Sequence, residues 1–134
     1  MKLKEPLLFR QQAYIDGAWC NADSGATFGV DNPATGEIIG QVPDMGAAET
    51  QRAIDAANAA LPAWSKLSAK ARGAILRKWF DLIMVNADDL AQLMVLEQGK
   101  PFAEAKGEVA YGASFVEWFA EEGKRAYGDV IPTQ

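Results

Sequence analysis

Residues 13–20 read AYIDGAWC, which is two short apolar runs joined by the dipeptide Asp16-Gly17. Asp-Gly favours a type I′ turn, because both central residues of that turn need a positive φ. A second pair of apolar runs follows at residues 27–30 and 37–42, with the turn sequence NPATG between them. Proline fixes its own φ and glycine accepts a positive φ, so this sequence suits a reversal. The stretch therefore predicts two β-hairpins.

From residue 47 the apolar residues recur at the period of an α-helix. In the first helix they form one stripe, and Pro62 is expected to mark its fraying end. Ser68 is a good N-cap for a second helix, because its hydroxyl can accept a hydrogen bond from a free backbone N–H. Two further helices follow, so the sequence predicts an α+β chain of two hairpins and four helices.

The third and fourth helices have end signals of their own. Asn86, with Asp89 three residues later, resembles a capping box for the third helix, and Gly99 fits the position that closes it. Pro101 suits the first position of the fourth helix, which is expected to end near Gly128.

The fourth helix is apolar on most of its sides. One buried face is expected to contain Val109, Val116 and Phe119. The aromatic residues on its other sides are Tyr111, Phe115 and Trp118. A helix that is apolar on most sides is buried on most sides. This pattern requires more protein than these residues supply, and we expect the isolated chain to expose the aromatic side chains and self-associate.

Composition excludes several classes of function. The chain has 134 residues, with 13 basic and 18 acidic side chains that are interspersed, so no nucleic-acid partner is expected. It has no histidine, which removes histidine-based triads, and its one cysteine, Cys20, excludes an internal disulfide. No run is long and apolar enough to suggest a membrane segment, and nothing resembles a signal peptide. A cytoplasmic protein is expected.

Four motifs then point to one family. They are residues 15–19 (IDGAW), 32–37 (NPATGE), 96–101 (LEQGKP) and 119–128 (FAEEGKRAYG). The fourth motif ends shortly before the sequence VIP at residues 130–132. The first two are common turns, the third is fairly specific, and all four together resemble the amino-terminal part of the aldehyde dehydrogenase superfamily. Within it, residues 115–125 (FVEWFAEEGKR) are most similar to bacterial succinate-semialdehyde dehydrogenases. Glutarate-semialdehyde dehydrogenases stay open as an alternative.

The resemblance implies a longer parent enzyme. Residues 1–45 would form hairpin arms, and residues 46–134 the helical part of an incomplete cofactor-binding domain. The parent would have the α/β aldehyde dehydrogenase fold with a Rossmann-like cofactor domain, use NADP or NAD, and form a homo-oligomer. The alternatives are one compact unit of hairpins and helices, or a self-contained helical assembly module.

The resemblance also implies where the chemistry lies. In the family a cysteine thiolate attacks the aldehyde, hydride passes to NAD(P)+, and a glutamate activates the hydrolytic water. These groups and the cofactor-binding residues lie beyond Gln134, so no catalytic and no cofactor-binding residue is expected in this chain. The role of the segment would be architectural, with the remainder of the enzyme as its partner.

Several residues within the chain invite a functional interpretation. Cys20 lies in an expected strand and is interpreted as an inert thiol. The acids Glu97, Glu121 and Glu122 are interpreted as solvated or ion-paired. By resemblance, Gly107, with Tyr111 or Ser114, would form a wall of the substrate tunnel. Also by resemblance, main-chain oxygens near Val30 and Glu97 are a weaker candidate for a monovalent-cation site. The glycines at 107 and 112 are interpreted as helix packing, not as a phosphate loop.

Overall fold

The computed structural model describes residues 2–129 and 131–133. Within them lie a short 3-10 helix η1 (Pro6–Leu8) and the strands β1 (Ala13–Ile15), β2 (Ala18–Cys20), β3 (Thr27–Asp31) and β4 (Ile38–Pro43). The α-helices are α1 (Ala47–Lys66), α2 (Ala69–Val85), α3 (Ala87–Gln98) and α4 (Phe102–Glu122). Two antiparallel hairpins are followed by four α-helices, so the expected fold of this segment is confirmed.

The first hairpin is the tight one that its sequence predicts. Asp16 and Gly17 have φ angles of 51° and 79°, so both central residues of the turn are left-handed, as a type I′ turn requires. Tyr14 pairs with Trp19 across the strands, and their ring centroids lie 5.0 Å apart. This cross-strand aromatic contact fixes the register of a hairpin that has three residues on each side.

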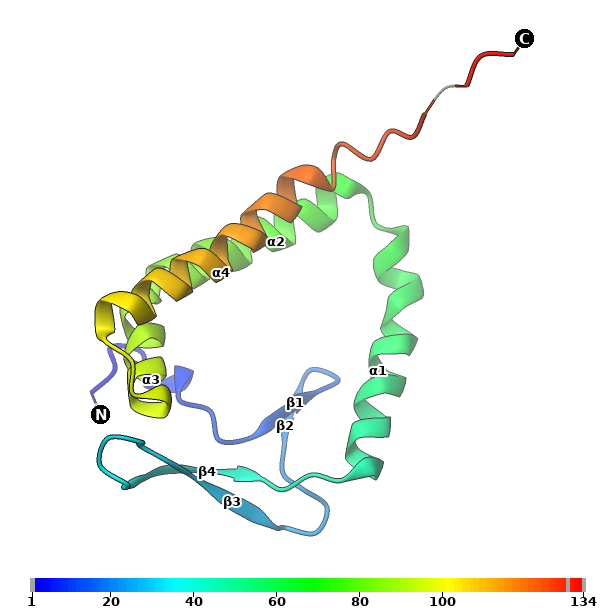
Figure 1. Cartoon of the computed structure of the whole chain (residues 1–134). Helices are drawn as coiled ribbons and strands as arrows, with labels where there is room; N and C mark the ends of the chain where they lie inside the picture. Colours follow the sequence, from blue (N-terminus) through cyan, green and yellow to red (C-terminus); the bar gives the residue numbers. More distant parts are fainter. Residues whose placement is uncertain (1, 130, 134) are drawn as a thin grey trace.

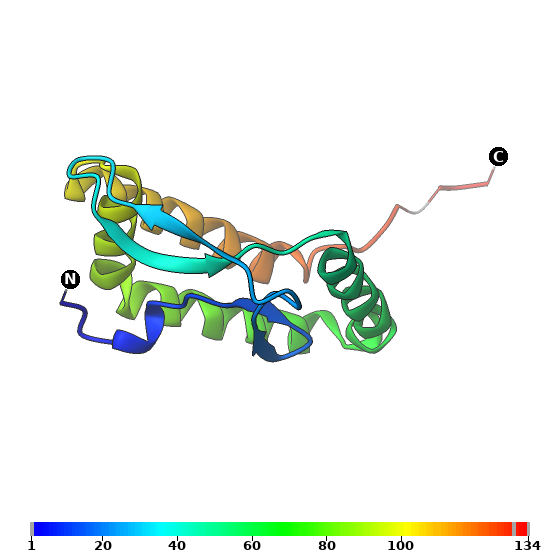
Figure 2. The same ribbon diagram turned by 90° about the horizontal axis from the view of Figure 1, so that it is seen from below.

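The second hairpin, β3–β4, forms a separate two-stranded sheet. Its turn is closed by Asn32, whose side-chain Oδ1 accepts a hydrogen bond from the N–H of Ala34 at 2.9 Å. The tip of this hairpin reaches the loop between α3 and α4 (Figure 2), where Pro33 lies against Gly99. The two hairpins form no common sheet, and Figure 1 shows them apart from α2 and α4, with β1 against α1 and the tip of the second hairpin at the α3–α4 loop.

Helix α1 is longer than its sequence suggests. It continues through Pro62 to Lys66, so the expectation that Pro62 marks its fraying end is wrong. The fixed φ of proline is close to the helical value, and the chain stays helical for four residues after Pro62 although the ring removes one backbone donor. After α1 the chain turns sharply into α2, so that α1 points away from the paired helices α2 and α4 (Figure 1).

The boundary between α2 and α3 corrects the expected capping box. Ser68 caps α2 as predicted, accepting a hydrogen bond from the N–H of Ala71 at 3.1 Å. Asn86, however, gives α3 no side-chain cap, because its Nδ2 donates to the carbonyl of Leu82 at the end of α2. Asp89 does not complete the box either, because its carboxylate accepts the backbone N–H groups of Lys4 and Glu5. Gly99 closes α3 in the left-handed conformation, with φ 71°, as expected.

Helix α4 begins at Phe102, with Pro101 as its N-cap and not its first helical residue, and ends at Glu122. The expectation that it continues to near Gly128 is wrong. A glycine at position 123 disfavours helix by about 1 kcal/mol, and the segment after it extends away from the helix pair (Figure 1), where no packing compensates for that cost.

The core of the chain is built from small residues where helices cross. Its buried apolar side chains in the helices are Ala87, Ala91, Ala105, Val109, Ala113 and Ala120. Helices α2 and α4 lie side by side and antiparallel (Figure 1), and Gly73 of α2 faces the backbone carbonyl of Ala120. Small residues let the two backbones approach, so the larger apolar side chains lie on the outer sides of the pair.

Candidate functional site

The three residues that resemblance suggests for a substrate tunnel share the outer side of α4. Gly107, Tyr111 and Ser114 are all exposed there. A side chain at Gly107 would meet no atom within 4 Å, so this position opens onto free space. Ser114 is held to the helix, because its Oγ donates to the carbonyl of Tyr111 at 2.7 Å. The arrangement forms a stripe and leaves no enclosed tunnel within these residues.

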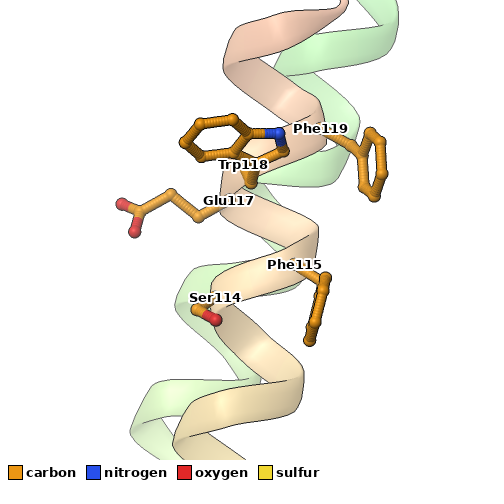
Figure 3. Close-up of a pocket in the computed structure, with 5 residues that line it drawn as sticks. All are labelled: Ser114, Phe115, Glu117, Trp118 and Phe119. Carbon is orange, nitrogen blue, oxygen red and sulfur yellow. The ribbon is translucent and has the colours of Figure 1, made fainter.

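A shallow pocket of about 400 Å³ lies further along the same helix (Figure 3). It is lined by Ser114, Phe115, Glu117, Trp118 and Phe119. The structure thus places Ser114 in the pocket wall and Gly107 outside it. Tyr111 is next to the pocket, because its ring meets that of Phe115 edge to face with centroids 4.9 Å apart. Phe119, expected on the buried face of α4, is 61% exposed and belongs to this surface.

Val30 and Glu97, far apart in the sequence, line one cavity of about 150 Å³. Its other lining residues are Phe9, Arg10, Gln11, Ile39, Gly40 and Val42. Strand β4, helix α3 and the N-terminal segment each supply part of the wall. Among these lining residues Glu97 is the carboxylate and Arg10 the cation, so the side chains of the cavity offset each other in charge. A cluster of three or more histidine, cysteine or acidic residues suited to a metal ion does not occur in residues 2–129 and 131–133.

The acids at the end of α4 are arranged as ion pairs. Glu121 pairs with Lys124 at 3.4 Å, and Glu122 pairs with Arg125. Cys20 is half-buried in β2, and its Sγ contacts the carbonyl oxygen of Ala13 at 3.6 Å. The ion pairing expected for Glu121 and Glu122 is observed, and the interpretation of these acids and of Cys20 as non-catalytic groups stays a prediction.

A buried carboxylate at the start of α1 was not singled out by sequence. Glu49 accepts hydrogen bonds from the N–H groups of Asp23 and Gly46, each at 3.0 Å. The bond from Asp23, followed by those from the backbone of Glu49 itself and of Gly46, lowers the pKa of Glu49. An acid three residues after Gly46 was the available signal, since that spacing lets the side chain reach back to the helix entry.

Two further charged groups surround this helix entry and its loop. Arg52 donates to both carboxylate oxygens of Asp23, at 2.6 and 2.8 Å. This two-pronged contact lowers the pKa of Asp23 and raises that of Arg52. These contacts of Glu49 and Asp23 join the loop after β2 to helix α1.

The described helices include none long and apolar enough to cross a membrane. The glycines at 107 and 112 lie inside α4, so their run does not form a phosphate-binding loop.

Comparison with known proteins decides the family. The sequence model described as "Aldehyde dehydrogenase family" matches residues 19–134. The chain belongs to the aldehyde dehydrogenase family. The resemblance found in the four motifs is therefore confirmed.

The aldehyde dehydrogenases most similar to this chain include two bacterial semialdehyde dehydrogenases. Glutarate-semialdehyde dehydrogenase of Pseudomonas aeruginosa is 69% identical over 132 residues, which are 98% of this chain and 27% of that protein. Succinate-semialdehyde dehydrogenase [NADP(+)] of Escherichia coli is 64% identical, with the same coverage of 98% and 27%.

A solved structure of a related semialdehyde dehydrogenase has the same fold over this span. The crystal structure of succinate-semialdehyde dehydrogenase from Burkholderia pseudomallei superposes with a TM-score of 0.96 at 63% identity, covering 99% of this chain and 28% of that one. The chain thus spans little more than a quarter of the length of these relatives, and within that span it has their fold.

Proposed function

We propose that this aldehyde dehydrogenase segment serves an NAD(P)-dependent enzyme that oxidises a semialdehyde of a short dicarboxylic acid. Succinate semialdehyde is the principal substrate proposed, and glutarate semialdehyde is the alternative. The observation that carries the proposal is 69% and 64% identity over 98% of the chain to relatives bearing these two names. The two substrates differ by one methylene group, a difference worth only about 1–3 kcal/mol in an apolar pocket.

The proposed role of the chain itself is architectural. The cofactor would be NADP or NAD, which accepts hydride from the substrate when bound. A relative's name specifies NADP(+), and a structural neighbour contains nicotinamide adenine dinucleotide. The described residues supply packing surfaces and ion-paired acids. The remainder of the enzyme, arranged as a homo-oligomer in the cytoplasm, is the partner that this proposal requires.

Within that role, the outer stripe of α4 is the proposed wall of the substrate tunnel. Gly107 opens onto free space, and Ser114 lines the pocket beside Tyr111 and Phe115. A glycine at the entrance leaves room for an aldehyde to pass. The cavity beside Val30 and Glu97 is a second proposal, for a monovalent cation held by main-chain oxygens, because the charge of Glu97 there is already offset by Arg10.

A chimera tests the architectural role. The aligned segment of the E. coli succinate-semialdehyde dehydrogenase is replaced by this chain, and NADPH formation is followed with both semialdehydes. The chimera is expected to be active and to keep the substrate preference of the E. coli enzyme, because the reactive groups come from the remainder. The isolated chain, given the same substrates and NADP+, is the control and should form no NADPH. A folded but inactive chimera would favour the assembly-module alternative, and turnover by the isolated chain would refute the proposal.

Two glycines of α4 test the tunnel wall in the same chimera. Gly107→Leu should raise KM for the semialdehyde several-fold, because the side chain would fill the proposed entrance. Gly112→Leu is the matched control, since Gly112 lies in the same helix and also has no neighbour within 4 Å. Steady-state kinetics distinguish the two variants. An unchanged KM in the Gly107 variant, or an equal rise in both, would exclude Gly107 from the wall.

A further inference from the structure

We propose that the N-terminal segment, residues 4–11, is a strap that forms a removable wall of the cavity lined by Val30 and Glu97, and that Asp89 is its latch. The strap lies beside α3 at one end and reaches β4 at the other (Figure 1). Three of its residues, Phe9, Arg10 and Gln11, line the cavity.

The latch is a buried carboxylate that holds the strap through its backbone. One oxygen of Asp89 accepts the N–H of Lys4 at 3.1 Å, and the other accepts the N–H of Glu5 at 2.8 Å. Asp89 is 5% exposed. Hydrogen bonds to a charged acceptor are stronger than neutral ones, and a buried carboxylate that loses its donors is left poorly solvated. Asp89 therefore favours the closed position of the strap over the open one.

The other end of the strap is held by weaker contacts. The Oε1 of Gln11 accepts the backbone N–H of Gln41 in β4 at 2.7 Å. A Cβ at Gly40 would lie 2.9 Å from the ring of Phe9, so glycine there lets the Phe9 side chain rest on the strand. The guanidinium of Arg10 stacks on Trp19, 4.8 Å from the centre of its ring. These neutral or exposed contacts close the cavity only while the latched end keeps the strap in place.

The neighbouring Asp88 provides a matched control. Its carboxylate pairs with the side chains of Lys106 at 2.7 Å and Lys4 at 3.4 Å, and all three side chains are about half exposed or more. Exposed ion pairs of this kind contribute little, because water and salt screen them. Asp88 touches the same segment of chain as Asp89 but does not bind its backbone.

Amide hydrogen exchange of the full chain, followed by mass spectrometry, tests the latch. In Asp89→Asn, exchange in residues 2–12 should accelerate about tenfold. The substitution removes the charge and replaces one accepting carboxylate oxygen by an NH2 group, which cannot accept a backbone N–H. Exchange at Gln41 in β4 should rise as well, while α4 stays unchanged. Asp88→Asn should alter the strap by less than about twofold.

A second variant keeps the test decisive if Asp89→Asn lowers overall stability. Gln11→Leu removes only the far-end acceptor of the Gln41 N–H, so it should accelerate exchange at Gln41 while the N–H groups of Lys4 and Glu5, held by Asp89, exchange as in the parent chain. An unchanged strap in Asp89→Asn, unchanged exchange in β4, or equal acceleration in α4 would each overturn the proposal. The last result would show that Asp89 supports the whole fold rather than the strap.

Discussion

Two buried acids, Glu49 and Asp89, show what single residues do in this segment. Each is placed near the start of a helix and accepts backbone hydrogen bonds from a distant part of the chain, Glu49 from Asp23 and Asp89 from Lys4 and Glu5. An acid early in a helix also suits the helix dipole. The same side chain therefore favours its helix and fastens a loop to it, which explains how a buried charge is tolerated in a chain with so small a core.

The contribution of Glu49 to the stability of the chain is predicted to depend on pH. Its pKa in the folded chain is lowered, mainly by the hydrogen bond from Asp23, relative to about 4.3 for an unfolded glutamate. Its contribution to stability is then complete above that unfolded pKa, and is lost as the pH falls through the lower folded value. Glu49→Gln should have a lower Tm than the parent chain at pH 7, and the difference should shrink below about pH 4.

Thermal unfolding followed by circular dichroism between pH 3 and 7 measures this difference. Glu37→Gln, at an exposed acid next to β4, serves as the control and should leave Tm unchanged throughout. A Glu49 effect that is the same at every pH would show that its shape matters and its charge does not.

At the scale of elements, the crossing of α2 and α4 depends on one glycine. A Cβ at Gly73 would lie 2.8 Å from the backbone carbonyl oxygen of Ala120, and a backbone atom cannot rotate away as a side chain can. The pair is also joined by Arg77 of α2 and Glu117 of α4, whose charged groups lie 2.7 Å apart. The glycine sets how closely the helices approach, and the ion pair lies at the edge of that contact.

Substitution of this glycine should separate the helices. Gly73→Ala is expected to lower the free energy of unfolding by about 1–3 kcal/mol, because overpacking outweighs the better helix propensity of alanine. Gly112→Ala, in open space on α4, is expected to raise it by up to about 1 kcal/mol. Denaturant titration measures both. A stabilised Gly73 variant would mean that the helices can move apart without loss.

On the scale of the whole molecule, the helix pair has apolar side chains on outer sides that nothing in the described chain covers. In α4 they are Tyr111, Phe115, Trp118 and Phe119, and in α2 they include Ile75, Trp79 and Leu82. Exposed apolar surface of this extent marks an interaction surface or a tendency to aggregate. The chain spans little more than a quarter of the length of its relatives, and we propose that the remainder of the enzyme packs on this apolar surface.

The isolated chain is therefore expected to self-associate and to bind a hydrophobic dye. Replacing both Phe115 and Trp118 by Glu should reduce association and dye binding several-fold, because charge on the α4 surface opposes apolar contact. Tyr127→Ser is the control, since Tyr127 is exposed on the extended segment after α4. Sedimentation velocity and dye fluorescence measure the effect. A monomer of the parent chain with a sharp two-state transition and no dye binding would contradict the expectation.

Local sequence was sufficient wherever the structure is decided by nearby residues. The Asp16-Gly17 turn, the Ser68 cap, the Gly99 helix end and the order of hairpins and helices follow from conformational preferences that act over a few residues. The family was also recognisable from motifs at the surface of turns and helix ends. These features need no knowledge of what lies across the fold.

Other features were decided only when distant segments met. Asp89 has the spacing of a capping acid, but its carboxylate oxygens accept hydrogen bonds from the N–H groups of Lys4 and Glu5 instead. The extent of α4 depends on packing that ceases after Glu122, and the meeting of Val30 with Glu97 depends on the path of the second hairpin. Local preferences amount to about 1 kcal/mol or less per residue, whereas a buried charge without donors costs more. For this reason the sequence alone determined the elements and the family, and the tertiary structure decided their ends, their partners and the cavity between them.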